Sequence, residues 1–136
     1  MAIDYHPQQG AILICDFDGM KTPEIIKRRP VIVISPRFRN RGKLCTIVPL
    51  STTAPRTIEK YHYQIELCPS LPKPYDEPLK WAKCDMIYTV SFERLFKPFI
   101  GKDDKGNRIY DERIIDKAEL EKIQECVKHG LELITS

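Results

Sequence analysis

The sequence predicts a mainly β protein, in which a small antiparallel barrel of short strands is followed by one C-terminal α-helix. Two observations predict this fold. Short apolar runs, bounded by Gly, Pro and polar clusters, recur up to residue 110, which is typical of strands. An amphipathic stretch with a helix-start signal follows them. A chain of 136 residues is long enough to bury one core, so residues 1–136 form a single domain.

The first three strands are predicted from apolar runs at 11–17, 30–35 and 43–50. Runs as continuous as the last two indicate strands buried on both faces, or the staves of a barrel. A fourth strand is predicted at 61–67, where apolar and polar residues alternate. Further strands are predicted at 81–84, 86–91, 96–100 and 108–110, the last two as a hairpin. Prolines crowd the segment 68–79, which is therefore predicted to be a surface loop.

The C-terminal helix is predicted over residues 117–134. Asp116 and Glu119 form a capping box, which marks a helix start. The apolar residues that follow recur at helical spacing on one face: Leu120, Ile123, Val127, Leu131 and Ile134. This face is expected to pack on the sheet.

Charge is distributed unevenly along the chain. Residues 20–60 hold ten of the 22 Lys and Arg residues but two of the 19 Asp and Glu residues. Such a one-sided field attracts polyanions such as nucleic acid, although a solvated loop face is the plainer interpretation. The five cysteines show no CxxC pattern, which favours reduced, mostly buried thiols. We expect a cytoplasmic protein, because neither a signal peptide nor a membrane-spanning run of about 20 apolar residues is found.

Arg29 is the first candidate site residue. It stands directly before Pro30 and a buried strand, so its charge must stay hydrated or meet an anion. The next strand runs out into the hydroxyls of Ser51 and Thr52. If the two strands pair, a guanidinium and these hydroxyls share one rim, which is an arrangement suited to phosphate.

Three segments in this order, 24–31, 48–52 and 81–85, resemble the MazF/PemK family of toxins from bacterial toxin–antitoxin pairs. With the first strand and the last helix, the resemblance covers nearly the whole chain. It implies an SH3-like (CcdB/PemK-type) barrel, a homodimer and metal-independent cleavage of single-stranded RNA. It also implies a partner, an acidic and partly disordered antitoxin. The toxin would bind DNA only as a complex with that antitoxin.

RNA can be cut by attack of its own 2′-OH on the adjacent phosphate, which needs a base, an acid and positive charge. Arg29 is expected to stabilise the transition state, and Thr52 with Ser51 to hold the phosphate. Glu24 matches the acidic residue five positions before the family's arginine, and the resemblance implies that it orients Arg29 or acts as base. The plainer interpretations are that Arg29 pairs with Glu24 or Asp85, and that Glu24 is a loop carboxylate.

Lys83 and Asp85 form the more ambiguous pair. Some family members carry Arg-Cys-Asp where this chain has Lys83-Cys84-Asp85, and there the Arg and Asp serve as acid and base. Lysine keeps the charge but loses the guanidinium fork. Asp85 is interpreted as a general base or as an ion-pair partner of Arg29 or Lys83. Pro23 stands where those members have a histidine, so that contribution is not carried over.

RNA-binding roles are predicted for seven residues: Lys27, Arg28, Arg37, Arg39, Arg41, Arg56 and Trp81. Trp81 is expected either to stack on a base or to fill the core, and the arginines to hold RNA or an acidic antitoxin tail. The sequence lacks HxH and HExxH patterns, and neither a metal nor another cofactor is expected.

Two other functions compete with an endoribonuclease. One is the gyrase-poison branch of the same fold, in which a C-terminal tripeptide with an aromatic residue is important. Residues 133–136 contain no aromatic residue, which argues against it. The other is a barrel that binds RNA or protein without activity. Retention of Glu24, Arg29, Thr52 and Asp85 together argues against this second alternative.

Overall fold

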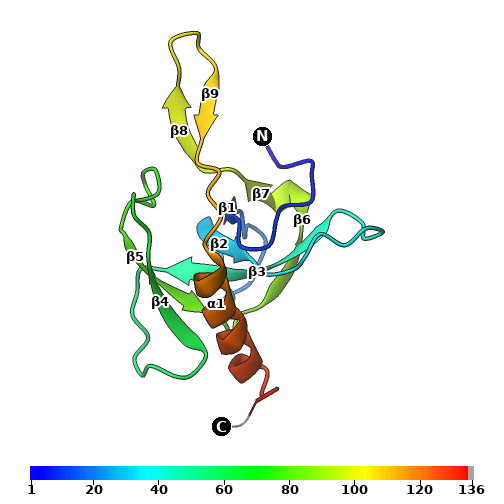
Figure 1. The fold of residues 1–136 in the computed structure, drawn as a ribbon, viewed down its shortest axis with the longest axis vertical. Coiled ribbons are helices and arrows are strands. Elements are labelled where there is room, and N and C mark those ends of the chain that lie inside the picture. Colours follow the sequence, from blue (N-terminus) through cyan, green and yellow to red (C-terminus); the bar gives the residue numbers. More distant parts are fainter. Residues whose placement is uncertain (135–136) are drawn as a thin grey trace.

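The computed structural model describes residues 1–134, which form nine strands and one α-helix (Figure 1). In chain order these are β1 (Ile12–Cys15), β2 (Arg29–Val33), β3 (Leu44–Ser51), β4 (His62–Glu66), β5 (Leu79–Lys83), β6 (Tyr88–Ser91), the 3-10 turn η1 (Phe92–Arg94), β7 (Leu95–Phe96), β8 (Phe99–Lys102), β9 (Arg108–Tyr110) and α1 (Lys117–Gly130). The mainly β fold with a C-terminal helix is therefore confirmed. The predicted strand at 96–100 is wrong in one respect, because Lys97 and Pro98 divide it between β7 and β8.

Five strands form a closed ring. β1 pairs with β2 and β7, β2 pairs with β3, and β3 pairs with β6, all antiparallel. The single turn η1 joins β6 directly to β7 and completes the circle. The ring encloses a first core cluster that includes Leu13, Phe17, Val31, Ile47 and Leu95.

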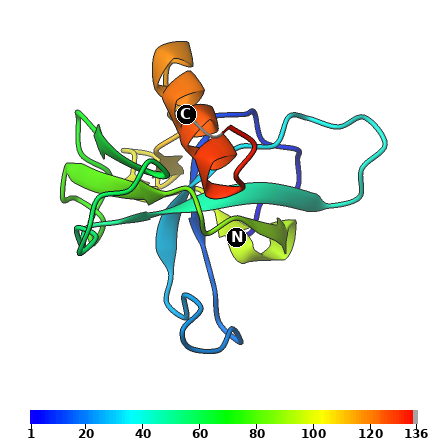
Figure 2. The same cartoon turned by 90° about the horizontal axis from the view of Figure 1, so that it is seen from below.

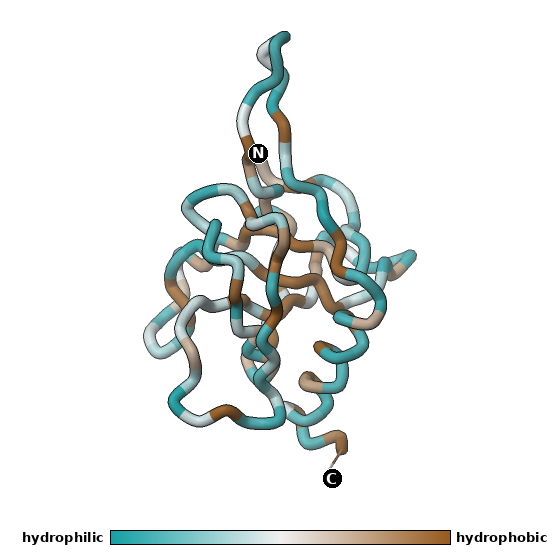
Figure 3. The backbone as a smooth tube through the Cα atoms, turned by 60° about the vertical axis from the view of Figure 1, so that its left-hand side comes forward, coloured by the Kyte–Doolittle hydropathy of each residue, from teal (hydrophilic) through white to brown (hydrophobic). Residues whose placement is uncertain are grey.

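A second layer starts from the far half of β3. Leu50 and Ser51 leave the ring and pair with β5, which pairs in turn with β4. Helix α1 lies across this sheet (Figures 1 and 2) and covers a second core cluster, to which Ile32, Val48 and Ile123 belong. Figure 3 shows the most hydrophobic segments crossing the middle of the molecule. Because side chains alternate along a strand, Ile47 faces the first cluster and Val48 the second.

The start of α1 matches the prediction, but its end does not. The Asp116 carboxylate accepts a hydrogen bond from the Glu119 backbone N–H at 2.8 Å. The helix ends at Gly130 and not at 134, because Glu132 takes a left-handed conformation with φ of 55°. The backbone N–H of Leu133 then donates to the carbonyl of Lys128 at 2.7 Å, which is the closing bond of a Schellman motif. Among residues 1–134, no helix is long and apolar enough to cross a bilayer.

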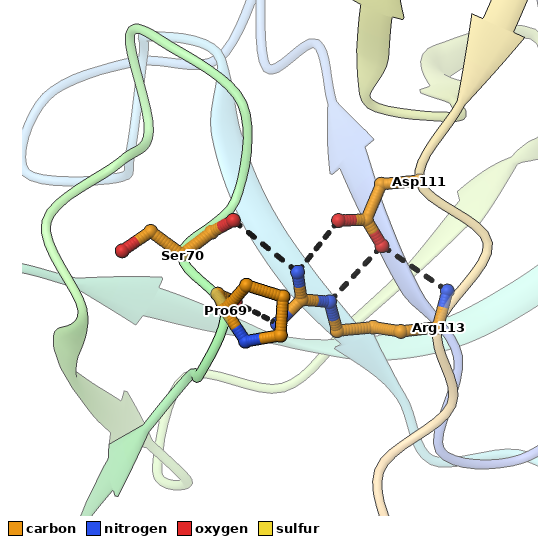
Figure 4. A network of polar contacts seen from close by, with 4 residues as sticks. All are labelled: Pro69, Ser70, Asp111 and Arg113. Atoms are coloured by element: carbon orange, nitrogen blue, oxygen red, sulfur yellow. Dashed lines mark hydrogen bonds and ion pairs between the residues drawn. The ribbon is translucent and has the colours of Figure 1, made fainter.

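The hairpin β8–β9 projects from the body (Figure 1), and the chain returns from it through a half-buried ion pair. Arg113 meets the Asp111 carboxylate at 2.7 Å and donates to the carbonyls of Pro69 and Ser70 (Figure 4). Burial would raise the pKa of Asp111, but hydrogen bonds from Arg113 outweigh it and hold that pKa below its ordinary value. This network ties the loop 67–78, irregular as predicted, to the segment before α1.

Candidate active site

A cavity of about 320 Å³ lies where β2 begins and where β3 and β5 end. It is lined by Thr22, Pro23, Glu24, Ile25, Ile26, Lys27, Arg29, Pro49, Ser51, Lys83 and Met86. The structure thus brings together four of the six residues that were predicted to be catalytic: Glu24, Arg29, Ser51 and Lys83.

Strand register explains this meeting. Val31 lies opposite Pro49, and Ser51 lies opposite Trp81. Residues opposite each other in an antiparallel pair share a face, and so do residues two apart along a strand. Arg29, Ser51 and Lys83 therefore lie on one face of the sheet. On the same face, Val31 packs in the core of the ring. Arg29, Ser51 and Lys83, at the strand ends, line the cavity.

The segment 18–28 forms the other wall of the cavity. Met20 and Ile25 pack against the ring core and anchor the segment. At its start, Arg94 donates to the backbone carbonyls of Asp16 at 2.9 Å and Asp18 at 2.7 Å. Near its middle, the Glu24 carboxylate accepts from the Lys21 backbone N–H at 2.7 Å. The carboxylate is therefore held in place at the cavity.

Arg29 is half-buried, and within residues 1–134 it forms no ion pair with Glu24 or Asp85. Its neighbour Arg28 is engaged instead, with the Asp16 carboxylate at 3.3 Å and the Phe96 ring at 4.8 Å. Arg28 does not line the cavity. The Arg29 guanidinium is thus available to an anion.

The two hydroxyl residues have different positions. Ser51 is 7% exposed, and its Oγ accepts a hydrogen bond from the Thr53 backbone N–H at 3.1 Å. Its hydroxyl proton can still be donated to an oxygen in the cavity. Thr52 is exposed on the bend after β3 and does not line the cavity.

The Lys83-Cys84-Asp85 triplet divides in a similar way. Lys83 lines the cavity, Cys84 is buried, and Asp85 is exposed in the turn after β5, outside the cavity lining. A hydrogen bond with the Cys126 thiol, together with burial, raises the pKa of Cys84. Cys84 is therefore a protonated core residue. Thr52 and Asp85 were predicted to lie with the other catalytic candidates, but neither residue lines the cavity.

The candidate RNA-binding residues fall into separate regions. Lys27 lines the cavity. Trp81 is half-buried, belongs to neither core cluster and lies opposite Ser51. Arg56 is exposed in the segment between β3 and β4. Arg28, as described above, does not line the cavity. The other three, Arg37, Arg39 and Arg41, lie in the β2–β3 connection, at the other end of both strands from the cavity (Figure 2).

Residues 8–131 match the family described as PemK-like, MazF-like toxin of type II toxin-antitoxin system. The chain belongs to this toxin family.

Relatives of this PemK/MazF-type toxin are found among uncharacterized proteins. It is 32% identical over 114 residues to YifN of Escherichia coli K12, which covers 70% of this chain and 75% of YifN. It is also 32% identical over 122 residues to an uncharacterized protein of Haemophilus influenzae, covering 80% of each.

The fold of this toxin is shared with solved structures of low sequence identity. One is an endoribonuclease in complex with its cognate antitoxin from a mycobacterial species, with a TM-score of 0.62 and 19% identity over 96% of this chain and 99% of that one. Another is MazF from Deinococcus radiodurans, with a TM-score of 0.62 and 15% identity over 95% and 99%. These likenesses concern the fold.

Sequence reasoning missed the apolar part of the toxin's cavity. Ile26, Pro49 and Met86 line it, and Ile26 is 48% exposed. The pair Ile25-Ile26 inside a polar segment was the available signal, since one of the two anchors the segment and the other faces the cavity. Within the described part of the chain, no group of three His, Cys, Asp or Glu residues is arranged to hold a metal ion.

Proposed function

We propose that this family member is a sequence-specific endoribonuclease, which cleaves single-stranded RNA without a metal ion and so inhibits translation. The observation that supports it most is the position of Arg29. Its guanidinium pairs with no carboxylate of residues 1–134 and shares a cavity with Glu24, Ser51 and Lys83. Cations and a hydroxyl donor suit a phosphodiester, and the carboxylate suits proton abstraction.

In the proposed reaction, a base removes the proton from a ribose 2′-OH, and the oxygen attacks the adjacent phosphorus. The new O2′–P bond forms as the P–O5′ bond breaks, which leaves a 2′,3′-cyclic phosphate and a protonated 5′-oxygen. Arg29 would neutralise the crowded phosphate through two guanidinium N–H groups, and Ser51 would donate to one of its oxygens. Thr52, on the bend beyond Ser51, would hold the flanking phosphate.

The proton transfers are assigned from position. Glu24 faces the cavity and is proposed as the base, with Asp85 in the neighbouring turn as the alternative. Lys83 also faces the cavity and is proposed as the acid for the 5′-oxygen. Lys27, Trp81 and Arg56 would contact the RNA on either side of the cut.

Arg29→Ala is predicted to reduce cleavage by at least about a hundredfold and to leave the protein folded, because the side chain stabilises charge that develops in the transition state. Arg29→Lys should retain intermediate activity, since it keeps charge but not the fork. The measurement is incubation with a long, weakly structured RNA in excess EDTA, followed by primer extension to map the ends. Lys105→Ala, on the tip of the β8–β9 hairpin, is the charge-matched control.

Cuts at one short sequence, made by the wild type and the control but not by Arg29→Ala, would support the proposal. Loss of the circular-dichroism spectrum in Arg29→Ala would instead make Arg29 a structural residue. Intact RNA from a wild-type protein that still arrests growth would reject the nuclease and direct attention to gyrase. For that alternative, Thr135 and Ser136 of the C-terminal tripeptide lie outside the described residues.

The proposed partner is a cognate antitoxin, whose extended acidic segment would cover the cationic cavity. DNA would be reached only through that antitoxin. We also propose a homodimer, which sedimentation equilibrium would test, and a cytoplasmic location, where messenger RNA is found.

A further inference from the structure

The β2–β3 connection carries a second cluster of positive charge. Residues 34–43, here called the arginine loop, project from the body (Figures 1 and 2). Four cations stand in the loop, Arg37, Arg39, Arg41 and Lys43, and no Asp or Glu occurs between residues 25 and 58. At its tip, the Phe38 side chain is 46% exposed.

The base of the arginine loop is fixed by the N-terminal segment. The Gln9 amide donates to the Ile34 carbonyl at 2.7 Å, and Arg37 Nε donates to the His6 carbonyl at 3.0 Å. The His6 ring nitrogen Nε2 lies 3.1 Å from the Arg41 carbonyl oxygen, and the His6 ring packs edge-on against Phe92 at 4.8 Å. These contacts hold both ends of the loop and present its tip to solvent.

The side chains at the tip are free for a ligand. Among residues 1–134, Arg39 and Lys43 make no side-chain hydrogen bond or ion pair. The Arg41 guanidinium lies 5.4 Å from the centre of the Phe38 ring, and the Phe38 side chain remains 46% exposed. An exposed ring flanked by unneutralised cations is the combination that holds single-stranded nucleic acid, since bases stack on the ring and phosphates meet the cations.

We propose that the arginine loop is a second binding site for single-stranded RNA, separate from the cavity at Arg29. This inference rests on the proposed function in that the bound RNA is the substrate. An acidic peptide would match the charge equally well, but it gives no role to the exposed Phe38 ring. The RNA strand is therefore the occupant that uses the whole cluster.

The two sites are separated by the length of β3. Eight residues lie between the arginine loop and the end of β3 at Ser51. At about 3.3 Å per residue this is about 25 Å. A strand with stacked bases, which advances about 3.4 Å per nucleotide, needs about eight nucleotides to reach both sites, and a more extended single strand needs fewer. A substrate trimmed to the cut sequence would therefore depend less on the arginine loop than a long one does.

The binding test uses the full-length wild type with a fluorescent 20-nucleotide RNA that carries 2′-O-methyl groups, because these block the attacking hydroxyl. Fluorescence anisotropy is recorded at several salt concentrations. Arg39→Ala should weaken binding and lower the slope of log K against log salt by about one. Phe38→Ala should weaken binding at least fivefold with an unchanged slope, since it removes stacking but no charge. Lys105→Ala is the control and should bind as the wild type does.

Unchanged affinity in both loop variants would overturn the inference. Polyglutamate serves as the probe for an acidic peptide. If the loop variants lose affinity for polyglutamate but keep their affinity for RNA, the loop binds an acidic protein and the inference is overturned. The nuclease is tested separately with unmodified RNA. Once the cut sequence is mapped, Arg39→Ala should lower kcat/KM for a 20-nucleotide substrate more than for a substrate trimmed to the cut sequence. A protein that binds RNA through the loop yet cuts none would reject the nuclease alone.

Discussion

Lys80 is an unusual residue for its position, because its side chain is only 2% exposed between β4 and the loop 67–78. Burial lowers its pKa below 10.5, and the nearby carboxylates of Glu77 and Asp76 offset only part of this effect. Between the folded and the unfolded pKa, the unfolded chain binds more protons than the folded chain does. Stability contributed by this group therefore rises with pH up to about 10.5.

Lys80→Met is predicted to stabilise the fold by about 1 kcal/mol at pH 7, since it fills the same space without a buried charge. The gain should shrink between pH 7 and pH 11, because above 10.5 the wild-type lysine loses its proton in the unfolded state as well. Urea unfolding at the two pH values measures it. Lys102→Met, at an exposed position, should show neither effect, and a destabilised Lys80→Met protein would contradict the prediction.

Three of the four predicted residues that line the cavity lie on strands, and the fourth, Glu24, lies in the segment before β2. Arg29, Ser51 and Lys83 lie at strand ends on one face, and the period of two in a strand places them from sequence alone once the pairing is known. Thr52 and Asp85 are one or two residues farther, in bends that follow no such period. Neither Thr52, in its bend, nor Asp85, in its turn, lines the cavity.

At the scale of elements, Gly130 allows the end of α1 to touch the turn after β5. A Cβ atom at this position would lie 2.8 Å from the Cys84 carbonyl oxygen and 3.1 Å from the Asp85 Cα. Both neighbours are backbone atoms, which cannot rotate out of the way. The contact therefore fixes the turn that follows Lys83.

Gly130→Ala is predicted to destabilise the protein by about 1–3 kcal/mol, because the helix end or the turn must shift. Thermal unfolding measures the loss. Gly101→Ala is the matched control, since a Cβ there has no atom within 4 Å and should be tolerated. Equal melting temperatures for the two variants would show that the turn adapts.

The sequence located the start of α1 but not its end, for a physical reason. Asp116 is a standard N-cap, whereas the left-handed residue that ends the helix is Glu132 and not the glycine that usually marks such a place. The apolar spacing continues through Leu131 and Ile134 and conceals the end. The ring of five strands was anticipated only as a barrel, since pairing between β1 and β7 joins segments far apart in sequence.

At the scale of the whole molecule, the Asp111–Arg113 pair joins the hairpin return, the proline-rich loop and the approach to α1. Because the Asp111 pKa is held below 3.8, its contribution to stability is complete above that pH and is lost as pH falls through the folded value.

Asp111→Asn is predicted to lower the free energy of unfolding by about 1–3 kcal/mol at pH 7, because Arg113 loses its charged partner. The difference from wild type should close at strongly acidic pH, where Asp111 is protonated in both states. Urea unfolding at pH 7 and below pH 3 provides the measurement. Asp104→Asn, in the exposed hairpin turn, should be neutral at both, and a constant difference would assign the effect to packing.

The β8–β9 hairpin leaves the body in a different direction from the segment 18–28 and from the arginine loop (Figures 1 and 2). None of its residues belongs to either core cluster, and its tip at Gly106 is open on all sides. The hairpin tip is therefore a suitable site for a chemical label. A biotin or fluorophore placed at this tip would tether the protein to a surface while the cavity and the arginine loop both remain open to solution, as single-molecule recordings of RNA capture require.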